Sequence, residues 1–455
     1  KNGAKLNAVI TVNPDAMKIA DSLDQVPLQL RKGALFGVPV LLKDNIDTKD
    51  KMPNTAGSLA MKDSFPLHDA FLVEKLRKSG AIIIGKTNLS EWANFRGMMS
   101  VSGWSGNGGL TKNPYDLTRN TCGSSAGSGA AISANLGIFA IGTETNGSII
   151  CPSSVNGIVG LKPTVGLVSR SGIIPISVSQ DTAGPMTRTV KDAAIALGVL
   201  TGVDKKDAHT LASKNIAKTD YTSFLKLDGL KGKRIGYSKK SSGNVKVDAL
   251  FQENLKFLEK EGAILVEISE EPVSNEIQGK SFDLMILEYK DGLNNYFKSL
   301  GQNTKIKSVE ELIVFNKNNP EEMKYFKQEF LEMTQATKGM QDENYAKLLK
   351  KIQEGSRKNG IDATLKKYKL DALIAASTSP AWKTDMVNGD NYIFEGSGAA
   401  AIAGYPSITV PMGNIDGLPV GILFYAEAWS EGKLINMAYT FEQKNPQRLV
   451  PQFKN

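Results

Sequence analysis

Two serine-containing turns are the parts of this chain whose residue types could do covalent chemistry. The first is Gly123-Ser124-Ser125-Ala126-Gly127-Ser128, and the second is Asn146-Gly147-Ser148. Small residues let a backbone bend sharply and leave N–H groups free, as a serine nucleophile and its oxyanion require. The backbone N–H groups of Thr145, Asn146 and Gly147 are therefore candidates for an oxyanion hole beside Ser148.

A serine nucleophile also needs a base. The chain has only two histidines, His68 and His209, both in charged, turn-like surroundings, which argues against a Ser-His-Asp arrangement. Lys43 ends the apolar run from 38 to 42, where desolvation would lower the pKa of its amine toward neutrality. Lys43 is therefore the best candidate for the base.

These three residues resemble the amidase signature family, hydrolases that use a Ser–cis-Ser–Lys triad. The family's lysine follows a Gly-(Val/Ile)-Pro strand and is matched by Lys43. Its bridging serine is matched by Ser124 and its nucleophile by Ser148, 24 positions further on. The resemblance implies a cis peptide bond at Ser124 and a proton relay from Ser148 through Ser124 to neutral Lys43. It also implies an acyl-enzyme and neither metal nor cofactor.

Within the family, the chain is most similar to bacterial peptide amidases, through segments such as 87–97 and 102–105. Asn146 stands where the wider family has a glycine, and Ile150 where it has an arginine. This similarity implies hydrolysis of a carboxamide, the C-terminal amide of a peptide, without a partner subunit. Trp104, in a loop rich in Gly, Ser and Asn, is expected either to line the substrate cleft or to pack the loop. Ser125 is expected to hold its turn and to lie close to the substrate.

Three other functions stay open at this point. One is the glutaminase subunit of a tRNA-dependent amidotransferase, and another is an amidase of broad range for aliphatic or aryl amides. The third is a binding protein that uses the same cleft without catalysis. Ile150 and the segments shared with peptide amidases argue against the first, and the complete triad argues against the third.

The composition is typical of a soluble globular protein, with 41% hydrophobic and 22% charged residues in 455. The net charge of +8 is spread along the chain without clusters of Lys and Arg among aromatics, so no nucleic-acid partner is expected. No apolar run reaches the length of a membrane span. A cytoplasmic location is favoured, although a sequence that begins at Lys1 leaves secretion open. Cys122 and Cys151 are expected to lie near each other as buried free thiols.

Helices and apolar strands alternate along much of the chain, which predicts an α/β protein. Asp69 is expected to cap a helix with Leu72, Val73 and Leu76 on one face, and the apolar stretch 81–85 reads as the following strand. Residues 280–368 are rich in Lys and Glu at helical spacing and are expected to form a lid-like helical region. Together with the resemblance, this predicts one domain, 1–455, with a large mixed central β-sheet covered by helices on both faces.

Overall fold

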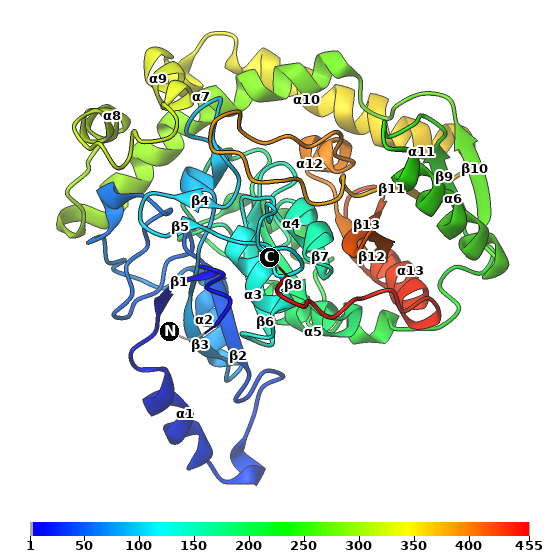
Figure 1. Cartoon of the computed structure of the whole chain (residues 1–455), viewed down its shortest axis with the longest axis horizontal. Coiled ribbons are helices and arrows are strands. Elements are labelled where there is room, and N and C mark those ends of the chain that lie inside the picture. Colours follow the sequence, from blue (N-terminus) through cyan, green and yellow to red (C-terminus); the bar gives the residue numbers. More distant parts are fainter. Residues whose placement is uncertain (1–2, 455) are drawn as a thin grey trace.

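One mixed β-sheet of 11 strands runs through the protein (Figure 1), as seen in a computed structural model that describes residues 3–454. The strand order is β1-β3-β2-β6-β8-β7-β12-β13-β11-β9-β10, and a separate two-stranded ribbon pairs β4 with β5. The strands are β1 (Val9–Val12), β2 (Pro39–Lys43), β3 (Ile82–Thr87), β4 (Trp104–Ser105), β5 (Gly109–Leu110), β6 (Phe139–Glu144), β7 (Val159–Lys162), β8 (Thr182–Thr187), β9 (Arg234–Ser238), β10 (Ile264–Ile268), β11 (Ala372–Ala376), β12 (Ser407–Ile415) and β13 (Leu418–Tyr425).

Helices cover both faces of the sheet, as predicted. They are α1 (Ala16–Asp24), α2 (Phe71–Lys78), α3 (Ala126–Ser133), α4 (Ile150–Val155), α5 (Val190–Leu200), α6 (Val245–Lys260), α7 (Asn275–Leu300), α8 (Val309–Lys317), α9 (Glu329–Ala336), α10 (Tyr345–Ser356), α11 (Asp362–Tyr368), α12 (Gly398–Ala403) and α13 (Glu431–Lys444). Within residues 3–454, none of these helices is both long and apolar enough to cross a membrane.

Alternation along the central strands explains the two layers. Val40 and Leu42 of β2 belong to one buried cluster, which includes apolar residues of α2, α5 and α13. Leu41, between them, belongs to a second cluster with Ala130 and Ile132 of α3. Successive side chains of a strand point to opposite faces, so a strand buried on both faces is apolar throughout. The run 38–42 is such a strand, and it ends at Lys43 as predicted.

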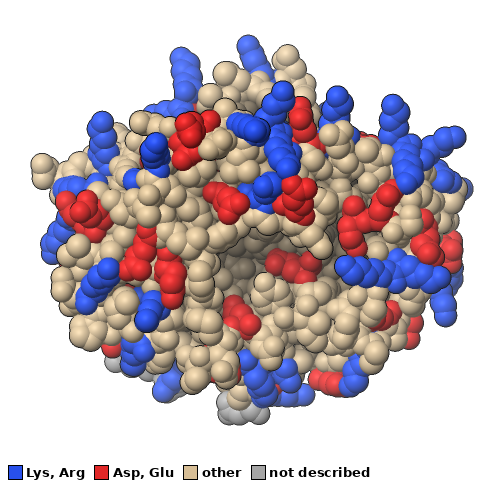
Figure 2. Space-filling view, turned by 90° about the horizontal axis from the view of Figure 1, so that it is seen from above, with Lys and Arg blue, Asp and Glu red and all other residues tan. Residues whose placement is uncertain are grey.

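The region 280–368 is helical, as its pattern predicts. Its helices begin with the long α7 and continue through α11, and α7 and α10 lie across the top of the molecule in Figure 1. Ser308 caps α8, because its side chain accepts a hydrogen bond from the N–H of Glu311. The face that carries these helices is hollowed near its centre, and Asp and Glu side chains lie in and around the hollow (Figure 2).

The predicted cap at Asp69 is wrong. Helix α2 begins at Phe71, and Ala70 precedes it without a side-chain cap. The Asp69 carboxylate instead accepts a hydrogen bond from the N–H of Lys49 and pairs with Arg77 of the same helix. The helix itself is confirmed, with Leu72, Val73 and Leu76 buried against the sheet. Tertiary partners therefore replaced the local cap that the sequence suggests.

The C-terminal segment 449–454 runs alongside the loop 114–117. The N–H of Phe453 donates to the carbonyl of Pro114 at 2.9 Å, and the N–H of Leu117 donates to that of Lys454 at 2.7 Å. The hydroxyl of Tyr115 donates to the carbonyl of Leu449 at 2.7 Å. This loop leads within a few residues to Cys122 and Ser124, so the end of the chain supports the approach to the first serine turn.

Candidate active site

Neighbouring strands place Lys43 beside the first serine turn. Lys43 ends β2, and Thr143 lies near the end of β6, the strand that pairs with β2 in parallel. The Nζ atom of Lys43 lies 2.7 Å from Oγ of Ser124, 2.8 Å from Oγ1 of Thr143 and 3.2 Å from the Thr143 carbonyl. The amide of Asn45 donates to the same Thr143 hydroxyl at 3.0 Å. The lysine is therefore held in one position by buried groups.

Burial changes the chemistry of this lysine. Its side chain is fully buried, and the loss of solvation lowers the pKa of Lys43 to about 7, although the acidic groups of Asp181 and Glu144 oppose the shift. A neutral amine is thus abundant near neutral pH and can accept a proton. The buried position of Lys43 agrees with the desolvation that its place at the end of an apolar strand predicts.

The two serine turns meet in space. The N–H of Ser125 donates to the carbonyl of Ser148 at 3.2 Å, and the peptide bond between Gly123 and Ser124 is cis. Ser124 and Ser148 both line a cavity of about 180 Å³, together with Thr145 and Asn146. Ser124 is 1% exposed and Ser148 is 9% exposed, so Ser148 is the more accessible of the two serines.

The turn before Ser148 leaves several of its backbone N–H groups without a hydrogen-bond acceptor within residues 3–454. Gly147 has φ +80, a left-handed conformation that glycine adopts without cost. The carboxylate of Glu144 accepts hydrogen bonds from the N–H groups of Ile149 and Ile150, which fixes the far side of the turn. Within residues 3–454, the N–H groups of Asn146, Gly147 and Ser148 have no acceptor. They are available to a substrate oxygen.

A disulfide joins the two turns, and the prediction of free thiols is wrong. Cys122 precedes the first serine turn and Cys151 lies in α4, just after Ser148; their Cα atoms are 6.0 Å apart. The prediction that they lie near each other is confirmed. Counting two cysteines in a long chain gave no sign of a covalent link, because pairing depends on how the turns meet rather than on the number of cysteines.

Trp104 and Ser125 have partners within the protein. Trp104 is 5% exposed, and its ring packs edge-on against Phe326 with centroids 4.9 Å apart. The hydroxyl of Ser125 donates to the carbonyl of Thr143 and accepts from its N–H, which ties the serine turn to β6. Neither residue is among those that line the cavity at Ser148. Whether either residue contacts substrate stays a prediction.

Several cavity residues were not predicted from the sequence. Met285 of α7 contributes from the helical region, while Asp390, Tyr392 and Glu395 come from the loop that follows β11. Thr143 and Asn45, which hold Lys43, were missed as well. Both residues lie near the ends of parallel strands, where polar residues often belong to a functional site. Their position at the strand ends could therefore have identified them from the sequence.

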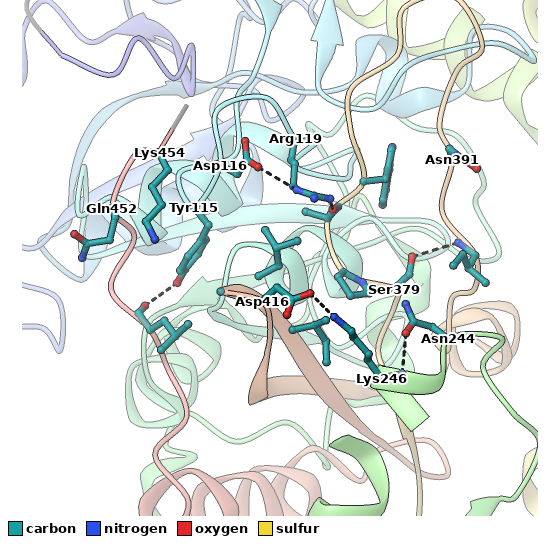
Figure 3. A pocket seen from close by; sticks show the side chains of 18 of the residues that line it. Tyr115, Asp116, Arg119, Asn244, Lys246, Ser379, Asn391, Asp416, Gln452 and Lys454 are labelled. Atoms are coloured by element: carbon teal, nitrogen blue, oxygen red, sulfur yellow. Dashed lines mark hydrogen bonds and ion pairs between the residues drawn. The ribbon is translucent and has the colours of Figure 1, made fainter. Parts of the chain in front are cut away.

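A larger cavity, of about 840 Å³, lies elsewhere (Figure 3). Tyr115, Lys246, Asp416 and the C-terminal segment line it, and no residue of the proposed triad does. Four of its charged side chains form ion pairs, Lys246 with Asp416 and Arg119 with Asp116. We therefore place the chemistry in the smaller cavity. Within residues 3–454, no cluster of His, Cys, Asp or Glu side chains is arranged to hold a metal ion.

Comparison with known proteins agrees with this picture. The family model described as Amidase matches residues 2–435. A probable amidase of Arabidopsis thaliana is 41% identical over 98% of this chain and 85% of its own. The crystal structure of the native peptide amidase of Stenotrophomonas maltophilia is 46% identical, covers 100% of this chain and 92% of its own, and superposes with a TM-score of 0.94.

A third relative has a different name. A glutamyl-tRNA(Gln) amidotransferase subunit of Thermoanaerobacter pseudethanolicus is 36% identical over 98% of this chain and 91% of its own. The catalytic fold is thus shared by proteins that are named for different reactions. Taken together, the match over almost the whole chain and the mixed sheet that carries the serine turns show that this protein is an amide hydrolase of the amidase signature family.

Proposed function

We propose that this protein hydrolyses the C-terminal carboxamide of peptides to a carboxylate and ammonia, with Ser148 as nucleophile, Ser124 as proton bridge and Lys43 as base. The observation that carries the proposal is the contact of 2.7 Å between the buried Nζ of Lys43 and Oγ of Ser124, in a wall of the cavity that Ser148 also lines. A lysine of lowered pKa beside a serine is the arrangement that activates a hydroxyl without histidine.

The proposed reaction begins with transfer of the Ser148 proton to Ser124, while Ser124 passes its own proton to neutral Lys43. The Ser148 oxygen bonds to the amide carbon, and the carbonyl oxygen becomes an oxyanion. The C–N bond then breaks, and the nitrogen takes the proton back through Ser124 and leaves as ammonia. Water attacks the acyl-enzyme by the same proton route and releases the carboxylate.

The oxyanion would be held by backbone N–H groups of the turn at Thr145, Asn146 and Gly147, with that of Ser148. The absence of an acceptor for three of these groups within residues 3–454 supports this role. Donors fixed in advance stabilise developing charge more than donors that must reorganise. Thr145 is fixed by the hydrogen bond that its hydroxyl donates to Asp181 at 2.6 Å.

Two observations support a peptide amide as substrate. The first is the similarity to the peptide amidase of Stenotrophomonas maltophilia. The second is that the cavity at Ser148, of about 180 Å³, shares Ala93, Thr145 and Ile176 with a neighbouring cavity of about 460 Å³, which offers room for the acyl part of a peptide. A primary amide needs space only for NH2 on the leaving side. We expect no partner subunit to be needed for this reaction.

A second candidate is a glutaminase that passes ammonia to a partner, since an amidotransferase subunit is 36% identical to this chain. Ile150, where the wider family has arginine, and the segments shared with peptide amidases count against it. Purified protein that releases ammonia from peptide amides, and not from glutamine, would separate the two.

One experiment tests the central proposal. A single peptide is offered as its C-terminal amide and as its free acid, and ammonia and fragments are followed by mass spectrometry, with Ser148→Ala as the inactive control. We expect ammonia and the free acid from the amide only. Fragments from internal cleavage would contradict the proposal, and so would activity confined to short aliphatic or aryl amides.

We keep the cytoplasmic location as a prediction, against which the disulfide between Cys122 and Cys151 counts, because stable disulfides are typical of oxidising compartments. Free thiols are alkylated in freshly lysed cells, and the peptides that contain the two cysteines are analysed by mass spectrometry. This measures whether Cys122 and Cys151 are reduced or joined by a disulfide in the cell.

A further inference from the structure

Glu395 lies against the turn that carries the proposed nucleophile. It lines the same cavity as Ser124 and Ser148. A Cβ atom added at Gly147 would stand 1.6 Å from Oε1 of Glu395, so the carboxyl occupies the space that the missing side chain leaves. Consecutive Cα atoms are about 3.8 Å apart, which places this oxygen within about 7 Å of the Cα of Ser148.

The carboxyl of Glu395 has few partners of its own. Its Oε1 accepts one hydrogen bond, from the hydroxyl of Ser397 at 2.8 Å, and no Lys, Arg or His among residues 3–454 forms an ion pair with it. Glu395 is an exposed residue, and it lines the cavity. Desolvation beside the turn raises the pKa of Glu395, and the nearby Glu144 acts in the same direction.

Asp390, the other carboxyl of this loop in the cavity, differs. Its oxygens accept hydrogen bonds from the N–H of Ser102, the amide of Asn120 and the ring N–H of Trp382. That network accounts for Asp390 as a residue that holds the loop in place. Glu395 keeps acceptor capacity that the protein itself does not use, and a cation or an N–H donor would satisfy it.

The distance between the Glu395 carboxyl and Ser148 limits which groups of the substrate can contact that carboxyl. When the amide carbon is bonded to Ser148, the next carbon of the acyl part is one bond away, and its nitrogen substituent is two bonds away. Glu395 lies beside Gly147 and within about 7 Å of the Cα of Ser148, so its carboxyl is within reach of that nitrogen. An aliphatic amide has no donor there, whereas an amino-acid or peptide amide carries an ammonium or an N–H at this point.

We propose that Glu395 is a specificity-determining residue that accepts a hydrogen bond from the α-nitrogen of the residue whose carboxamide is cut. This inference rests on the proposed function. It extends the substrate class from peptide amides to amides of single amino acids, whose α-ammonium group gains a charge-assisted bond. A peptide amide uses the same oxygen through a neutral N–H and does not need its charge.

The test compares phenylalaninamide with N-acetylphenylalaninamide, using the wild-type protein and Glu395→Gln. Glutamine keeps the shape and an acceptor oxygen but removes the charge. We expect kcat/KM for phenylalaninamide to fall about 10- to 100-fold, the loss of a hydrogen bond to a charged group, and that for the acetylated amide to fall less than about threefold. Retained hydrolysis of the acetylated amide shows that the variant is folded.

Asp385→Asn is the matched control, because Asp385 lies on the same loop outside the cavity and its side chain caps a local turn that asparagine can also cap. It should leave both substrates unchanged. Equal losses on both substrates in Glu395→Gln would mean that the carboxyl only supports the turn, and no loss on either would also overturn the inference. A wild-type protein that cleaves neither amide would overturn the proposed function together with it.

Discussion

The side chain proposed as base is withdrawn from water, while the proposed nucleophile is reachable. Lys43 has no exposed surface, and Ser148 is 9% exposed at the wall of a cavity. Burial of an amine costs free energy when it is charged, so the protein holds Lys43 near its neutral form without any metal or histidine. The hydroxyl of Ser124 lies 2.7 Å from the amine of Lys43, and we propose that it carries the proton between Lys43 and Ser148.

The value of kcat/KM should therefore rise with pH and then level off. Only neutral Lys43 can accept a proton, and its pKa is lowered to about 7. Below that pH the protonated form dominates, and kcat/KM for a peptide amide should fall roughly tenfold per unit; above it, the rate should level off. The measurement is kcat/KM for an uncharged N-acetylated amide between pH 5 and about 9. A flat profile over this range would exclude Lys43 as the base.

Ser148→Ala should lower kcat by roughly 10⁴-fold or more and prevent labelling by a serine-directed covalent probe. The fold should survive, because within residues 3–454 no group is hydrogen-bonded to the Ser148 hydroxyl; we expect the free energy of unfolding to change by about 0.5 kcal/mol or less. Ser133→Ala is the control and should keep full activity, because Ser133 is buried in α3 and its hydroxyl has no hydrogen-bond partner within residues 3–454. Substantial turnover by Ser148→Ala would place the nucleophile elsewhere, with Ser124 as the next candidate.

Gly147→Ala should also inactivate the protein. The new methyl group would meet the Glu395 carboxyl, and φ +80 disfavours any residue with a Cβ, so the turn must shift. Loss of aligned oxyanion donors predicts a fall in kcat of about 100-fold or more. Gly137→Ala is the matched control, because its added Cβ would come no closer than 3.4 Å to Leu41. Wild-type activity in Gly147→Ala would remove this turn from the oxyanion site.

The disulfide links a loop to a helix. It joins the segment before the first serine turn to α4, the helix that follows the nucleophile. The link closes a loop of 29 residues, and loops of this length contribute about 3–4 kcal/mol by restricting the unfolded chain.

Changing both Cys122 and Cys151 to Ser should therefore lower the free energy of unfolding by about 3–4 kcal/mol, measured with urea. Wild-type protein treated with a thiol reductant should become like the double variant, and the double variant should not respond to the reductant. If thiol titration shows two free cysteines and stability is unchanged, the link does not hold these elements together.

Sequence reasoning succeeded where local pattern and tertiary contact agree. The apolar strand that ends at Lys43 and the helix with Leu72 and Leu76 follow from burial and local hydrogen bonding. It failed where distant partners decide. The Asp69 carboxylate accepts a hydrogen bond from the N–H of Lys49 and pairs with Arg77 in the last turn of α2, so it does not cap the start of that helix.

The same limit applies to the site. Lys43, Ser124 and Ser148 could be named from motifs, because each lies in a distinctive short segment. Glu395 and Met285 come from segments more than 100 residues further along the chain, and no local feature of the sequence points them toward the cavity. Their positions depend on how the loop after β11 and helix α7 pack against the serine turns.

At the level of the whole molecule, one sheet contains strands from both ends of the described chain. β1 lies at one edge, and β12 and β13, from the C-terminal part, lie between strands of the middle part. We therefore expect residues 1–455 to behave as a single domain. Unfolding by urea, followed by tryptophan fluorescence and by far-UV circular dichroism, should give one coincident transition. Two separated transitions would show that the helical region 280–368 unfolds independently.

The pairing of segment 449–454 with loop 114–117 has a practical consequence for handling the protein. An affinity tag fused directly after this segment would disturb the hydrogen bonds between the segment and loop 114–117. That loop leads to Cys122 and Ser124. Tags, fusions and immobilisation chemistry are therefore better directed to surfaces such as the exposed side of α1, whose helix has no buried residue and lies far from the serine turns in Figure 1. Activity assays on material anchored through its last residues would measure the anchor as well as the enzyme.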